Sequence, residues 1–159
     1  MKLPVLIFCF AALFGFCNGI PCDEIPPVNA RVLSFVKANM AKKVGRGECW
    51  DLAAEALDAA GAKWDHEFGF GAVVNPGKEC IYPGDIIQFK GVELRYKKDN
   101  VNCVESMAQH TAVVYEVKDQ KVFTIADQNN GTTGKKVGLS QLDLNTIVKG
   151  KCRFYRPVQ

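Results

Sequence analysis

The sequence predicts an α+β domain, with helices in its first part and antiparallel strands in the rest. Residues 28–60 carry apolar side chains at helical spacing, whereas residues 85–127 are rich in β-branched and aromatic residues arranged as strands. Only a short turn separates the strand-like segments 110–117 and 122–127, which is typical of an antiparallel hairpin. These three observations place the helices before the sheet along the chain.

Two helices are predicted. The first, 28–43, gathers its apolar residues on one face, and Gly45 and Gly47 end it. The second, at about 48–60, is rich in alanine and stops at Gly61. Cys49 begins its apolar stripe, and the small alanines allow the helix to lie close to a sheet.

Loops and strands make up the rest of the chain. We expect residues 62–81 to form a long loop with its own aromatic residues. Residues 96–105 are polar and are expected to form a second loop, and residues 140–144 one helical turn capped by Ser140. Strands are expected at 85–89 with an extension to 95, at 110–117, at 122–127, weakly at 135–139, and at 151–157.

The first residues have the pattern of a secretory signal peptide. Lys2 supplies a positive charge, residues 3–16 are almost entirely apolar, and Cys17-Asn18-Gly19 supplies small residues for cleavage after Gly19. We therefore expect a signal peptide at 1–19, a secreted, extracellular protein, and one mature domain at 20–159. No later stretch is long and apolar enough to span a bilayer, so no membrane contact is expected after cleavage.

The charge balance excludes some partners. The whole chain has 20 basic and 17 acidic residues, and removal of Lys2 with the signal leaves a side-chain balance of +2. This is too weak to indicate binding to nucleic acid. We take the mature domain to be a monomer that requires no cofactor.

The number of cysteines indicates a free thiol. Of seven cysteines, Cys9 and Cys17 leave with the signal, and the five that remain cannot all pair within one chain. If Cys49 is the unpaired one, the others can form two bridges in three ways. We prefer Cys80–Cys103, because they flank one strand-and-loop segment, together with Cys22–Cys152, which would join the two ends of the domain.

Cys49 is the candidate nucleophile. It follows the turn Gly45-Arg46-Gly47-Glu48 and stands in the first turn of a predicted helix, where unpaired backbone N–H groups favour a thiolate. The alternative is a small buried residue or half of a disulfide. A cysteine nucleophile also requires a base and a group that orients the base.

His110 is the preferred base. It begins a strong strand, whereas His66 lies in the aromatic loop and is interpreted as a surface residue. The hairpin turn brings the end of the next strand back beside His110, so Asp127 or Asn129 could orient the imidazole. A metal site made of Cys49, His110 and Asp127 is not expected, because no closely spaced pair of ligands supports it.

The oxyanion of a reaction intermediate needs hydrogen-bond donors. The backbone N–H of Cys49, at a helix start, is a natural one. A second donor is less clear from the sequence, and Glu48, Trp50 or a loop residue could supply it.

Four segments in order resemble a known family. They are residues 47–50, 82–89, 110–114 and 127–131, and together they resemble the CHAP family (cysteine, histidine-dependent amidohydrolases/peptidases) and its NlpC-type relatives. The resemblance covers roughly residues 44–157 and implies a papain-like fold, with N-terminal helices packed on an antiparallel barrel-like sheet. The stretch 45–53 also resembles a papain-fold domain of certain fungal proteins.

The resemblance also implies roles for single residues. It places the nucleophile on Cys49, the base on His110, and the third, polar position on Asp127, with Asn129 beside it. The family often has glutamine before the cysteine, whereas this chain has Glu48. A carboxylate there does not donate to an oxyanion and would raise the pKa of the thiol, so this departure puts activity in question.

The candidate site at Cys49, His110 and Asp127 leads to three hypotheses about function. Our leading hypothesis is a secreted cysteine hydrolase that cleaves amide bonds in bacterial cell-wall peptidoglycan peptides, as bacterial members of the family do, or in another small peptide, through a thioester. The alternatives are an inactive binding module on the same scaffold, and a structural protein in which Cys49 bridges to another chain. Asn130-Gly131-Thr132 is an N-glycosylation sequon beside the third position.

Overall fold

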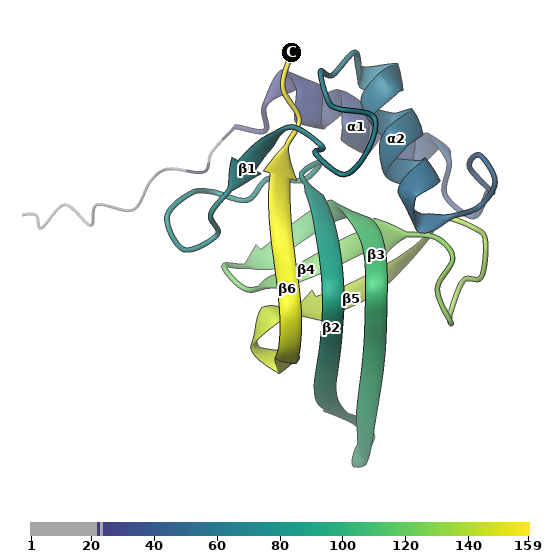
Figure 1. The fold of residues 1–159 in the computed structure, drawn as a ribbon, viewed down its shortest axis with the longest axis vertical. Coiled ribbons are helices and arrows are strands. Elements are labelled where there is room, and N and C mark those ends of the chain that lie inside the picture. Colours follow the sequence, from purple (N-terminus) through teal and green to yellow (C-terminus); the bar gives the residue numbers. More distant parts are fainter. Residues whose placement is uncertain (1–21, 23) are drawn as a thin grey trace, which may run out of the picture.

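The structure is a computed structural model that describes residue 22 and residues 24–159 (Figure 1). The expected signal peptide at 1–19 and its cleavage site lie outside the described residues. Across the described part of the chain, no helix has the length and apolar character needed to cross a membrane.

Two helices lie together above the sheet (Figure 1). They are α1 (Pro27–Ala38) and α2 (Cys49–Ala60). The first is shorter than the predicted 28–43. The chain leaves the helix after Ala38 because Ala41 takes a positive φ of 61° and its amide donates to the carbonyl of Val137, at 2.9 Å. This contact ties the end of α1 to the loop that follows the fourth strand.

The strands form one antiparallel sheet in the order β1-β6-β2-β3-β4-β5. This arrangement confirms the α+β class and its order of helices before strands. A short 3-10 helix, η1 (Leu144–Thr146), stands where a helical turn was predicted at 140–144, with Asp143 as its cap in place of Ser140. The strands are β1 (Ala72–Val74), β2 (Ile86–Lys98), β3 (Val101–Asp119), β4 (Val122–Asp127), β5 (Gly138–Asp143) and β6 (Ile147–Arg156).

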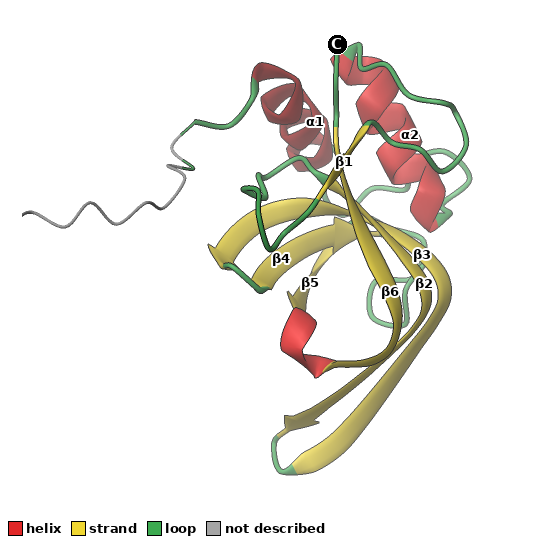
Figure 2. Ribbon diagram, turned by 60° about the vertical axis from the view of Figure 1, so that its left-hand side comes forward, coloured by secondary structure: helices red, strands yellow, loops and turns green. Residues whose placement is uncertain are grey.

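The predicted loop at 96–105 is wrong. β2 and β3 form a long hairpin with Lys98 opposite Val101, and Asp99 and Asn100 make the turn with φ values of 50° and 63°. Figure 2 shows this arm projecting beyond the other strands. Side chains on both faces of the arm are largely exposed, so the alternation of apolar and polar residues that marks a half-buried strand is missing.

The sheet is strongly curved (Figure 2), and the buried apolar side chains form two separate cores. One lies between the helices and the sheet, and the other lies on the concave side of the sheet. The largest buried side chains are Leu52, Leu57, Phe70 and Ile86 in the first core and Ile87, Phe89, Phe123, Leu142 and Phe154 in the second.

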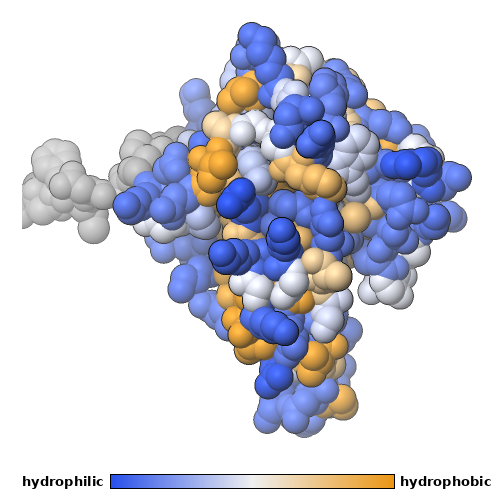
Figure 3. All heavy atoms as spheres, in the orientation of Figure 1, coloured by the Kyte–Doolittle hydropathy of each residue, from blue (hydrophilic) through white to orange (hydrophobic). Residues whose placement is uncertain are grey.

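The surface over β6 and β2 is mostly hydrophilic in the view of Figure 3.

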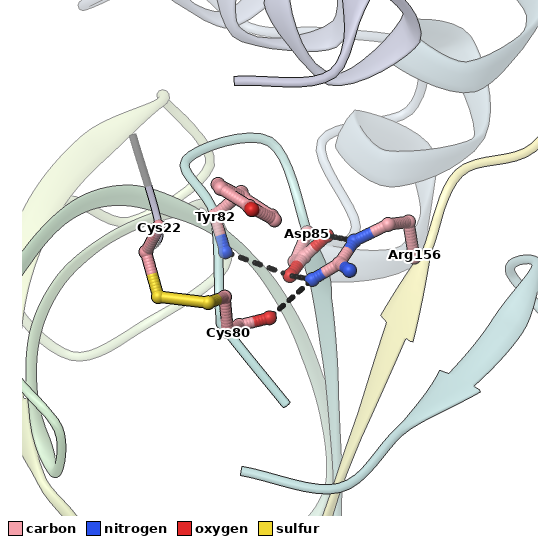
Figure 4. Close-up of a disulfide and its surroundings, with 5 residues drawn as sticks. All are labelled: Cys22, Cys80, Tyr82, Asp85 and Arg156. Atoms are coloured by element: carbon pink, nitrogen blue, oxygen red, sulfur yellow. Dashed lines mark hydrogen bonds and ion pairs between the residues drawn. A yellow bond between two sulfur atoms is a disulfide. The ribbon is translucent and has the colours of Figure 1, made fainter. Parts of the chain in front are cut away.

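The disulfide differs from the expected pairing. Cys22 is bonded to Cys80, so the preferred pairs Cys80–Cys103 and Cys22–Cys152 are both wrong (Figure 4). Cys103 lies on the projecting arm opposite Tyr96, and Cys152 lies on β6 against the concave core. Neither is bonded to another cysteine of the described chain. Free thiols in the described residues are therefore Cys49, Cys103 and Cys152 rather than one alone.

Candidate functional site

Cys49 is the first residue of α2, and the turn before it is held by side chains on both sides. Within that turn Gly45 and Gly47 take φ values of 55° and 86°, which glycine adopts without strain. Asp51, in the first turn of the helix, accepts hydrogen bonds from the amides of Arg46 at 2.8 Å and Glu48 at 3.2 Å. These bonds fix the position of Cys49 at the helix start.

Gln128 fixes the same turn from the side of the sheet. Its Oε1 accepts from the amide of Val44 at 3.1 Å, and its Nε2 donates to the carbonyls of Val44 at 2.9 Å and Glu48 at 2.8 Å. The residue is fully buried. This role of Gln128 was not predicted from the sequence, although strand alternation already separates Gln128 from its neighbours Asp127 and Asn129.

The surroundings of the Cys49 sulfur favour a thiolate. Burial raises the pKa of this thiol, but a hydrogen bond with His110 and the imidazole charge lower it, and so do the backbone amides of Thr111 and Trp50. The net result is a pKa below the ordinary value of 9.0. Thr111 can donate here because the pairing of β3 with β4 starts only at Val113.

His110 joins the thiol to a carboxylate. Its Nε2 lies 2.7 Å from Oδ2 of Asp127, and the two residues are only 7% and 3% exposed. Burial lowers the pKa of His110, but the bonds with Asp127 and Cys49 outweigh it and raise the pKa to about 9. A lowered thiol pKa beside a raised imidazole pKa favours a thiolate–imidazolium pair at neutral pH.

Asn129 and Glu48 bond to each other rather than to the imidazole. The side-chain nitrogen of Asn129 donates to Oε2 of Glu48 at 2.6 Å, and Lys135 pairs with Oε1 at 2.9 Å. Strand β4 ends at Asp127, and Asn129 takes a φ of 61°, so its side chain no longer follows the strand alternation. Of the two alternatives for orienting His110, the structure places Asp127 in contact with the ring.

The side chains considered as second oxyanion donors are occupied. The indole of Trp50 donates to the carbonyl of Glu67 at 2.5 Å, and Glu48 presents a carboxylate that accepts hydrogen bonds. The backbone N–H of Cys49 remains, since the first amides of a helix have no partner within it. His66 is exposed, as was predicted for a surface residue, and its ring meets that of Trp64 at a tilt of 46°.

A groove of about 910 Å³ runs up to His110 and Asp127. One wall is the stretch 105–110 of β3, and the other consists of residues 129–132 and 139–143. The buried side chains of Phe89, Leu94, Ile125 and Leu142 line its apolar floor. A smaller hollow, of about 420 Å³, lies on the hairpin arm at Cys103. Among the described residues, no cluster of three His, Cys, Asp or Glu side chains is arranged to hold a metal ion.

Fold and site together define a domain with a cysteine proteinase fold, in which a cysteine at a helix start faces a histidine on a sheet. Residues 28–159 match the AIM3/BBC1 cysteine proteinase-fold domain, and the chain belongs to this family. This establishes the papain-like cysteine proteinase fold, the coarser part of the sequence prediction, without singling out CHAP or NlpC.

One curated relative is "Altered inheritance of mitochondria protein 3" of Debaryomyces hansenii, 30% identical over 167 residues. The match covers 89% of this chain but 18% of that protein, so the chain spans less than a fifth of its length. Two crystal structures of Ly7917 are also similar. The one "with the hydrolyzing product of MDP" is 17% identical with a TM-score of 0.49 and covers 81% of this chain and 62% of that one. The other is 18% identical with a TM-score of 0.46, over 80% and 62%.

Proposed function

We propose that this domain is a secreted cysteine hydrolase that cleaves amide bonds in peptides. One observation carries the proposal: the Cys49 thiol, with its lowered pKa, faces an imidazole that is itself hydrogen-bonded to the buried Asp127. This is the order of nucleophile, base and orienting group that cysteine hydrolysis requires. Membership of the AIM3/BBC1 cysteine proteinase-fold domain family supports it.

The chemistry follows from the three groups. The Cys49 thiolate attacks the carbonyl carbon, and the negative charge that develops on the carbonyl oxygen is met by the Cys49 N–H at the start of α2. The His110 imidazolium gives its proton to the leaving amine, and a thioester remains. Water then attacks the thioester while His110 takes its proton, which releases the carboxylic acid and restores the thiolate.

An extended peptide is the substrate that we infer for the groove. Amides along a strand point alternately to opposite sides, and the Thr111 amide points to the Cys49 sulfur, away from β2. The amides of Gln109 and Met107 therefore face the same open side. A peptide that pairs with this edge of β3 is led directly to the thiolate. Cell-wall peptides are one such substrate class.

Secretion is part of the proposal. It rests on the signal-like pattern of residues 1–19. The Cys22–Cys80 disulfide supports it, because structural disulfides persist in oxidising compartments.

The test uses protein secreted by an expression host, incubated with fluorogenic peptides and with purified peptidoglycan stem peptides. We expect hydrolysis by the parent protein and complete loss in Cys49→Ala and His110→Ala. The matched controls are Cys103→Ala and Cys152→Ala, which remove the other free thiols and should retain the activity. Equal hydrolysis by the parent and Cys49→Ala would overturn the proposal.

One feature favours a second candidate, an inactive binding module. Glu48 stands where the resembling families often have glutamine, and its ion pair with Lys135 holds a carboxylate beside the nucleophile. In that case a peptide would bind the groove and remain intact, although Cys49 would still react with alkylating agents.

A further inference from the structure

Asp127 is held from two directions. Its Oδ2 faces His110, and its Oδ1 accepts a hydrogen bond of 2.7 Å from Nδ2 of Asn130. The carboxylate therefore has a fixed partner on each oxygen. Hydrogen bonds to a carboxylate are among the stronger ones in proteins, so the Asn130 bond restrains the plane in which Asp127 meets the imidazole.

The orientation of the Asn130 amide is itself determined by its surroundings. Its Oδ1 accepts from the amide of Thr132 at 2.8 Å, from the amide of Thr133 at 2.7 Å, and from the Thr133 hydroxyl at 3.0 Å. A reversed amide would turn its oxygen toward the Asp127 carboxylate and its nitrogen toward two backbone N–H groups. Only the observed orientation satisfies every partner.

We propose that Asn130 is a positioning residue for the Cys49–His110–Asp127 site, and that its sequon is closed to glycosylation in the folded protein. The inference rests on the proposed function. The nitrogen that would carry a glycan is the same atom that holds Asp127. Asn130, Gly131 and Thr132 also line the groove, so a sugar on this nitrogen would enter the space in which a peptide binds.

Two substitutions separate the roles of the sequon and of the hydrogen bond. Thr132→Ala destroys the sequon but keeps the bonds of Asn130, because Thr132 contributes through its backbone amide. Asn130→Ser also destroys the sequon and keeps an oxygen that can accept from the turn, but its shorter side chain cannot donate to Asp127. Comparison of the two variants therefore reports on the Asp127 bond alone.

The measurements are the alkylation rate of Cys49 by iodoacetamide as a function of pH, the NMR signal of the Asn130 side-chain amide, and the mass of the Asn130 peptide from secreted protein. In Asn130→Ser we expect the alkylation rate at pH 7 to fall about tenfold, as for a lost hydrogen bond to a charged group. Thr132→Ala alters the groove wall but keeps the bond between Asn130 and Asp127, so we expect its alkylation rate to fall much less than that of Asn130→Ser. The Asn130 amide protons should be shifted and slow to exchange in the parent, and that residue should carry no glycan.

The possible outcomes test the positioning role of Asn130, the closed sequon and the proposed hydrolase function separately. Parent-like alkylation in Asn130→Ser overturns the positioning role, and a glycan on Asn130 of folded, thiol-reactive protein overturns the closed sequon. If Asn130→Ser does not fold, Asn130→Asp keeps the acceptor for the turn while its carboxylate gives no donor at neutral pH, and the same comparison is made with it. A parent protein with an unreactive Cys49 but a protected Asn130 amide contradicts the proposed function, not the bond.

Discussion

Gln128 and Val44 lie 84 residues apart in the chain and are joined by two hydrogen bonds, one in each direction. Gln128 follows Asp127 directly, and Val44 opens the turn that leads to Cys49. The same buried side chain also holds the carbonyl of Glu48. The nucleophile on α2 and the carboxylate on β4 are therefore positioned by one shared residue.

Replacement of Gln128 should affect both stability and the site. We expect Gln128→Leu to lower the free energy of unfolding by about 3 kcal/mol, because it leaves the buried Val44 amide without a partner and removes one of the two hydrogen bonds that the carbonyls of Val44 and Glu48 each accept. Alkylation of Cys49 should slow in the protein that remains folded. Urea unfolding and iodoacetamide labelling measure the two effects. Gln120→Leu, in an exposed turn, is the matched control, and a similar small loss in both variants would contradict the shared role.

The pH dependence of Cys49 alkylation should depend on His110. In the parent the rate should rise with a midpoint below 9.0, because the imidazole lowers the thiol pKa. His110→Ala removes this effect and leaves burial, which raises the pKa, so the midpoint moves upward. A shift of one pKa unit is about a tenfold loss of rate at neutral pH.

Cys152 is an internal control for that experiment. Burial raises its pKa to about 12, so it should stay unreactive at neutral pH in both proteins. Mass spectrometry of the alkylated peptides distinguishes the two thiols. An unchanged midpoint for Cys49 in His110→Ala would contradict the ion-pair assignment.

Glu48 should have little influence on the thiol. Its carboxylate is bound to Lys135 and Asn129, and the lowered pKa of Cys49 follows from His110 and from backbone amides. Glu48→Gln should therefore leave the alkylation midpoint within about 0.3 pH units of the parent, well below the shifts that a direct charge partner causes. A clear fall in the midpoint would instead support the view from the sequence that Glu48 suppresses the nucleophile.

The sequence was informative where a strand is buried in the sheet. The segments 110–117 and 122–127 were predicted as a hairpin from their β-branched and aromatic residues and the short turn between them, and that hairpin led to His110 and Asp127 as neighbours. The same reasoning failed at 96–105, where the arm lies outside the core and both faces meet solvent. Only the register with β2 shows that this polar stretch is a strand.

The remaining site residues depend on tertiary contacts that a sequence pattern does not contain. Asn129 was an alternative to Asp127 until the positive φ turned its side chain toward Glu48. The disulfide pairing also depends on tertiary contacts. The number of cysteines limits how many can pair, but it does not show which ones are close in the fold. Cys22 reaches Cys80 only because the segment before α1 lies beside the loop that follows β1 (Figure 4).

The Cys22–Cys80 disulfide should contribute strongly to stability. It spans a sequence separation of 58 residues, for which the loss of chain entropy in the unfolded state predicts about 4 kcal/mol. Cys22→Ser and Cys80→Ser should each lower the free energy of unfolding by about this amount. Cys103→Ser, on the exposed arm, is the control and should change it by less than about 0.5 kcal/mol. Equal stability of Cys80→Ser and Cys103→Ser would contradict the observed pairing.

Arg156 and Asp85 form a largely buried ion pair next to the disulfide (Figure 4). Two guanidinium nitrogens reach the two Asp85 oxygens at 3.1 and 2.9 Å, and Tyr82 and Asn29 donate further hydrogen bonds. Removal of one partner of a buried pair leaves an uncompensated charge. Arg156→Met should therefore lower the free energy of unfolding by about 4 kcal/mol at neutral pH.

The sign of the pH dependence makes this prediction specific. Burial raises the pKa of Asp85 above its ordinary 3.8, even though Arg156 opposes the shift. A raised pKa in the folded state means that folding favours the protonated acid, so this contribution to stability is present at low pH and is lost as the pH rises through the folded pKa. Without Arg156 the pKa of Asp85 rises further, so in Arg156→Met this carboxyl is protonated at a higher pH. The loss in free energy of unfolding caused by Arg156→Met should therefore become smaller as the pH falls toward 4. Urea unfolding at several pH values measures it against Arg153→Met, an exposed arginine of the same strand. If the loss in free energy of unfolding in Arg156→Met instead became larger on acidification, this would contradict the view that Asp85 is charged and paired with Arg156.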